Sequence, residues 1–165
     1  MKFFTREWAA AMCPDGAAVR AAYKEHCREM REHLTPALLH FLTEVNLHDA
    51  KRAKMTFEFG RIPSLALIFG GVCETQDGLT GERSDFAIKY VGLEGVEFSK
   101  NGVFEMDADI TFMEVWADEL HLASNGAFDH HLLFAHNHEM IVTFRDMEFG
   151  IMKHNDVRIE PRAGS

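Results

Sequence analysis

The spacing of apolar residues changes once along the chain, near residue 50, and this change constrains the fold more than any other feature. Before it, apolar residues recur every three or four positions, as on one face of a helix; the clearest series is Val19, Tyr23, Cys27, Met30 and Leu34. After it, apolar and polar residues alternate, as in a strand with one buried face; the first series is Met55, Phe57 and Phe59. Helices followed by strands predict the α+β class.

About three helices are expected within residues 1–46. The first begins after Thr5, a residue type that caps helices, and the second begins after Asp15. The third has Thr35 as its cap and Pro36 as its first residue. We expect this helical segment to cover part of a sheet.

Residues 47–165 predict a meandering, mainly antiparallel sheet of about seven strands. The run Leu65–Phe69 is apolar on both faces, which is typical of a central strand, and Gly92 and Gly95 indicate a bend. Asn-Gly pairs at Asn101 and Asn125 mark hairpin turns, and a last turn is expected near residues 137–138. No linker or repeat interrupts the chain, so a single domain over 1–165 is expected.

The hairpins also predict which side chains face each other. With a three-residue loop at each Asn-Gly pair, apolar residues lie opposite apolar residues, and histidines lie opposite carboxylates. A two-residue loop does not give these pairs. The expected pairs are Phe98 with Phe104, Leu122 with Phe128, His121 with Asp129, Glu119 with His131, Phe134 with Ile141 and Leu133 with Val142.

The charge of the chain disfavours two classes of partner. Lys and Arg number 17 against 26 Asp and Glu, giving a formal net charge of -9, and no basic cluster occurs. Nucleic acids and anionic membranes both require such clusters. The run Leu65–Cys73 is far shorter than the ~20 apolar residues of a spanning helix, and the first residues lack the apolar core of an export signal. A cytoplasmic protein is expected.

An acidic stretch lies in the second half of the chain. Between Glu94 and Glu119 eight carboxylates accompany a single basic residue, Lys100. The stretch is either a solvated face that keeps the protein soluble or a surface for a basic protein partner. Small acidic α+β proteins include bacterial immunity and antitoxin-like inhibitors, an analogy of size and charge. The candidate binding residues are Glu105, Asp107, Asp109 and Glu114.

Histidine is the unusual residue type, with ten in the chain and six of them between positions 121 and 154. The expected strand registers bring two imidazoles and several carboxylates to one sheet face, where they could hold zinc or another divalent cation. The alternative is a solvated face on which histidine-carboxylate pairs are ordinary. The candidate ligands are His121, His131, Glu119, Asp129 and Asp146.

No motif for nucleophilic catalysis, phosphate binding or dinucleotide binding occurs, and no catalytic residue is assigned. Two hypotheses follow. The first is a non-catalytic binding module, immunity-like or regulatory, that uses the acidic sheet surface and needs no cofactor. The second is a metal-dependent hydrolase built on the histidine-carboxylate cluster.

Three short stretches carry a resemblance to a known family. They are the start Met1–Trp8, the junction Asn46–Ala50, and a C-terminal part with Asp118–Leu120, Phe128–Phe134 and Phe144–Asp146. Together they resemble an uncharacterised bacterial family of small intracellular domains. The resemblance implies a helix-then-sheet order and a bacterial origin, and it supplies no catalytic residue.

Overall fold

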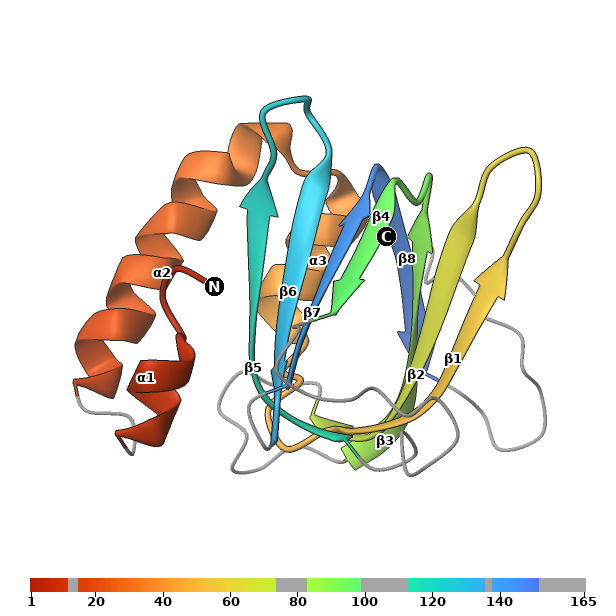
Figure 1. The fold of residues 1–165 in the computed structure, drawn as a ribbon. Helices are drawn as coiled ribbons and strands as arrows, with labels where there is room; N and C mark the ends of the chain where they lie inside the picture. Colours follow the sequence, from red (N-terminus) through yellow and green to blue (C-terminus); the bar gives the residue numbers. More distant parts are fainter. Residues whose placement is uncertain (12–14, 74–82, 99–112, 136–137, 152–165) are drawn as a thin grey trace.

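The computed structural model describes residues 1–11, 15–73, 83–98, 113–135 and 138–151, and its elements are labelled in Figure 1. The protein is α+β: helices occupy the first part of the chain and antiparallel strands the rest. The helical elements are α1 (Arg6–Ala10), α2 (Gly16–Met30), a 3-10 turn (Arg31–His33) and α3 (Pro36–Glu44). None of the described helices is long and apolar enough to cross a membrane.

Two of the three expected helix caps are confirmed. The Thr5 hydroxyl accepts the N–H of Trp8, and the Thr35 hydroxyl accepts the N–H of Leu38. Helix α2 begins directly after Asp15, as expected, but the expected side-chain cap is wrong, because the Asp15 side chain makes no capping hydrogen bond. Asp15 has a left-handed backbone with φ of 55°, whereas a capping side chain needs an extended one.

The described residues contain eight strands instead of the expected seven. They form two four-stranded antiparallel sheets, ordered β4-β7-β6-β5 and β1-β2-β3-β8, and the start of β5 pairs with the start of β1 to join them. The central position expected for β2 is confirmed. The strands are β1 (Lys51–Glu58), β2 (Ser64–Cys73), β3 (Arg83–Val91), β4 (Gly95–Phe98), β5 (Met113–Leu122), β6 (Phe128–Phe134), β7 (His138–Phe144) and β8 (Asp146–Ile151).

The additional strand arises from a bend shared by two neighbouring segments. The chain passes from β3 to β4 through Gly92, whose φ of 66° suits glycine, and a Cβ there would lie 2.9 Å from the Cβ of Arg145. Opposite, the chain passes from β7 to β8 through Arg145, whose N–H donates to the carbonyl of Val91. The segment expected to be one final strand is therefore divided between the two sheets.

The strand registers test the expected hairpins. All three expected pairs around Asn125 are confirmed. The pairs expected across the last turn are wrong, because Phe134 lies opposite His138 and Leu133 opposite Glu139. The observed register sets the buried Leu132 opposite the buried Met140, which the expected register does not. The pair of Phe98 with Phe104 lies outside the described residues.

Helix α3 packs against both sheets and lies behind β6 and β7 in the view of Figure 1. Its side chains Leu38 and Phe41 are buried, and the Phe41 ring lies 5.5 Å from that of His130 on β6 and 5.7 Å from that of Phe149 on β8. Helix α2 lies on the other side of β5, together with the N-terminal segment (Figure 1). The polar site around Glu119 of β5 lies on this side, between β5 and the N-terminal segment with α2.

Candidate functional site

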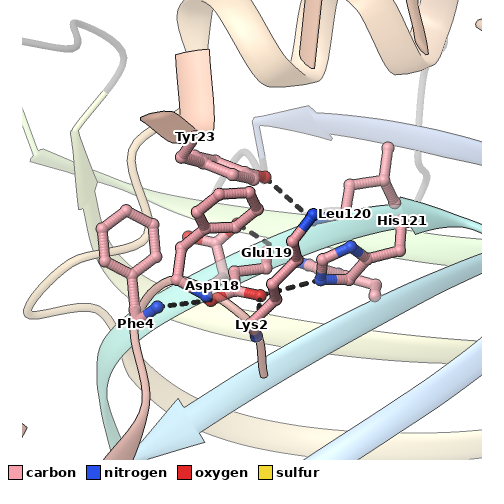
Figure 2. Close-up of polar contacts among 9 residues, drawn as sticks. Lys2, Phe4, Tyr23, Asp118, Glu119, Leu120 and His121 are labelled. Atoms are coloured by element: carbon pink, nitrogen blue, oxygen red, sulfur yellow. Dashed lines mark hydrogen bonds and ion pairs between the residues drawn. The ribbon is translucent and has the colours of Figure 1, made fainter. Parts of the chain in front are cut away.

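A buried carboxylate on β5 binds the beginning of the chain. Glu119 is fully buried, and its side chain accepts the backbone N–H groups of Lys2 (2.8 Å), Phe3 (2.7 Å) and Phe4 (2.5 Å). His121 Nε2 lies 2.7 Å from Oε2 of the same carboxylate, the oxygen that also accepts the N–H of Lys2 (Figure 2). Three successive amides around one anion form a backbone nest, so Glu119 anchors the N-terminal segment.

The apolar side chains of that segment dock beside the carboxylate. Phe4 is buried, and its ring lies 5.3 Å from those of both Trp8 and Tyr23. The Phe3 ring lies 5.5 Å from that of Tyr23 and 5.2 Å from that of His26. Burial of these rings removes water from around the carboxylate, which strengthens its hydrogen bonds.

Tyr23 of α2 covers the edge of β5. Beyond Val115, β5 has no ladder to β1 among the described residues, and the Tyr23 hydroxyl accepts the N–H of Leu120 at 2.8 Å (Figure 2). Burial raises the pKa of the Tyr23 hydroxyl well above its usual value. A side chain thus takes the place of a strand on this edge.

The ionisation of Glu119 is set by two opposing effects. Burial by itself raises the pKa of a carboxyl group, but the hydrogen bonds from His121 and the backbone amides outweigh it and lower the pKa of Glu119 to about 2. The group is therefore a permanent anion at neutral pH, whose charge is matched by aligned N–H dipoles.

Three histidines surround this anion. The His121 ring lies 4.9 Å from that of His131 on β6 and 4.9 Å from that of His26 on α2. Nε2 of His26 and Nδ1 of His131 are buried and have no hydrogen-bond partner within the described residues. Burial and the neighbouring His121 lower the pKa of His26, and burial is the main cause that lowers the pKa of His131 to about 4.

The structure brings four of the five candidate metal ligands onto one face of the sheet. Glu119 pairs with His131 and His121 with Asp129, as expected. Asp129 Oδ1 accepts the hydroxyl of Thr143 at 2.7 Å, and Glu119 is occupied by backbone amides.

Asp146 is the fifth candidate, and it lies elsewhere. At the start of β8 it accepts the hydroxyl of Thr35 and the N–H of Met147. Within the described ranges no group of three or more His, Cys, Asp and Glu side chains is arranged to hold a metal ion. As they are arranged, the described residues therefore do not form a zinc site.

The acidic stretch is only partly described. Glu105, Asp107 and Asp109 lie outside the described residues, and Glu114 is half-buried opposite Lys51 at the junction of the sheets. Glu97 is exposed on β4. The carboxylate of Glu119, which belongs to the same stretch of sequence, is buried and takes no part in an acidic surface.

A second buried polar cluster was not expected from the sequence. His130 Nδ1 shares a 2.7 Å hydrogen bond with the Tyr90 hydroxyl, and His130 Nε2 lies 3.1 Å from Asp118 Oδ2. His130 and Tyr90 are fully buried between the sheets. A signal was present, because His130 alternates with Phe128 and Leu132 and so lies on the same buried face of β6.

Replacing Tyr90 with phenylalanine tests that cluster. The variant leaves a buried imidazole nitrogen without its partner, so we expect the free energy of unfolding to fall by ~1–3 kcal/mol. Urea denaturation of Tyr90→Phe beside the parent measures the change. A loss below about 0.5 kcal/mol would show that the hydrogen bond between Tyr90 and His130 contributes nothing to stability.

Comparison with known proteins identifies no relative from which a function could be transferred. No protein-family model matches the chain. No curated protein is significantly similar to it. The resemblance to a bacterial family stays a prediction, and the functional conclusion depends on the geometry of the residues described above.

Proposed function

We propose that the protein is a non-catalytic cytoplasmic binding module that recognises a basic protein partner. The observation that carries this proposal is the role of Glu119. The carboxylate best placed among histidines to act as a base or ligand is fully buried and bonded to three backbone amides and to His121. Its hydrogen-bonding capacity is used to hold the fold, and not for chemistry on a substrate.

The proposed binding surface is acidic. The net charge of -9 favours encounter with a positively charged partner, because complementary charge accelerates association. Glu97 is exposed on β4, an outer strand of its sheet, and Glu105, Asp107 and Asp109 follow it in the sequence. An immunity-like or regulatory role suits such a surface.

The metal-dependent hydrolase has less support. It needs three ligands around one ion and a further carboxylate as general base. Asp146 lies apart from the histidine cluster, and Glu119 is already saturated with hydrogen bonds. We also propose, from the resemblance alone, that the chain belongs to the bacterial family of small intracellular domains.

Charge reversal tests the binding proposal. The test variant carries Glu97→Lys, Glu105→Lys, Asp107→Lys and Asp109→Lys, and the immobilised protein is exposed to bacterial lysate at low and at high salt. We expect the parent to retain a defined set of basic proteins at low salt, and the variant to lose them. The matched control reverses four exposed helix carboxylates, Glu25, Glu29, Glu32 and Glu44, and should retain the same proteins.

Equal retention by parent and test variant contradicts the proposal, as does retention that is indifferent to salt. Elemental analysis distinguishes the proposed binding module from the metal-dependent hydrolase. Near-stoichiometric metal in the parent that is lost in a His121→Ala and His131→Ala double variant would favour the hydrolase instead.

A further inference from the structure

The β1–β2 hairpin carries an exposed apolar end. Phe57 is 38% exposed, Phe59 88% and Ile62 63%, and these are the exposed large apolar side chains of the described residues. The rings of Phe57 and Phe59 stack with centroids 6.1 Å apart. The hairpin extends away from α2 and α3 (Figure 1), so neither helix covers this end. Such a cluster is typical of an interaction surface.

The same hairpin has an edge with no strand beside it in the described part of the chain. There, β1 pairs with β5 only at Lys51 and Arg52, whereas its pairing with β2 continues from Lys54 to Glu58. Backbone N–H and C=O groups on such an edge are a template for another strand. An edge-pairing partner would also cover the neighbouring aromatic rings.

The sequence of this edge is complementary to itself. In an antiparallel pair of β1 strands centred on Thr56, Lys54 of one copy lies opposite Glu58 of the other. Met55 then lies opposite Phe57. Lys54, Thr56 and Glu58 are exposed on one face and Met55 and Phe57 share the other, so charges meet on one face and apolar groups on the other.

Existing contacts leave Glu58 available for this pair. Its Oε2 accepts the Ser64 hydroxyl and lies 2.9 Å from Lys89 Nζ, and both contacts use the same oxygen. The carboxylate is thereby held on the charged face of β1, with Oε1 able to accept from a further ammonium. Shifting the register to centre on Lys54 would instead set two lysines against each other, which is unfavourable.

We propose that the protein forms a two-fold symmetric dimer by antiparallel pairing of β1 with β1 of a second copy, centred on Thr56. The occupant of the edge is a second molecule of this chain, because its charges match in that register. The interface is isologous, so each residue contributes twice. This proposal is independent of the acidic binding surface.

Two charge-reversal variants test the proposal. In a dimer of Lys54→Glu alone, or of Glu58→Lys alone, positions 54 and 58 of the two copies carry the same charge and face each other at two places. We therefore expect dimerisation to weaken by about tenfold or more. An equimolar mixture of the two variants restores both opposite-charge pairs and is expected to dimerise. Analytical ultracentrifugation across a concentration series measures each equilibrium.

A matched control and a folding check keep the test decisive. Lys24→Glu makes the same charge change on an exposed position of α2 and should dimerise like the parent. Circular dichroism reports folding, and because Lys54 is exposed, the Lys54→Glu result stands even where Glu58→Lys is destabilised by losing Lys89. A monomeric parent at millimolar concentration, an undiminished dimer in Lys54→Glu, or no dimer in a mixture of folded variants would each overturn the proposal.

Discussion

The Glu119→Ala variant is expected to lose ~3–5 kcal/mol of the free energy of unfolding, because it removes one partner of a buried charged network. Three backbone N–H groups and the His121 ring would lose their common acceptor. The N-terminal segment would then detach and expose Phe3 and Phe4. Urea denaturation measures the loss, and limited proteolysis near residue 4 reports the detachment.

Two further variants locate the cause of that loss. Glu119→Gln keeps one acceptor oxygen and replaces the other with an NH2 group that cannot accept, so it should lose stability but less than Glu119→Ala. Glu97→Ala removes an exposed carboxylate from β4 and should stay within about 0.5 kcal/mol of the parent. Stability of Glu119→Ala within about 1 kcal/mol of the parent would show that the nest is not a principal anchor.

Local patterns predicted the parts of the fold that depend on neighbours in sequence. The hairpin at Asn125 needs only a short loop and alternating side chains, so its register and the pairing of Glu119 with His131 followed from the sequence. The glycine bend was also indicated, and Gly92 has a positive φ there. The division of the last strand at Arg145 was not indicated by the sequence. It depends on the bend at Gly92, because Arg145 is hydrogen-bonded to the neighbouring Val91.

The candidate site depends on contacts between residues far apart in the chain. Glu119 is separated by 115 to 117 positions from the amides it binds, and no periodicity links the two segments. In the sequence Glu119 looks like any other member of the acidic stretch. The apolar face of α2 was indicated by its spacing, but nothing in the sequence showed that His26 beside that face would meet His121 of a distant strand. Composition identified the histidines, and tertiary packing determined what they do.

Acidification is expected to destabilise the protein in two successive pH ranges. Burial lowers the pKa of His131 from 6.5 to about 4, so the unfolded chain takes up that proton before the folded one does. The resulting stability is complete above pH 6.5 and is lost as the pH falls towards 4. The pKa of Glu119, lowered from 4.5 to about 2, extends the loss below pH 4.5.

The loss of unfolding free energy in the first pH range has an expected size that can be measured. The shift at His131 corresponds to ~3 kcal/mol at most, and because the ring is half-buried we expect ~2 kcal/mol between pH 7 and pH 4.5. The lowered pKa of His26 acts in the same direction. Free energies of unfolding from urea titrations at the two pH values give the loss directly.

His131→Gln should remove much of that first loss, since glutamine has no proton to gain in this range, and it should leave the second range unchanged. His33→Gln replaces an exposed histidine of the 3-10 turn and should keep the pH dependence of the parent. If His131→Gln and the parent lost equal stability between pH 7 and pH 4.5, His131 would not be the group that couples folding to acid. If the loss in the variant shrank as expected, the half-buried imidazole next to the Glu119 anchor would be established as a group that couples folding to acid.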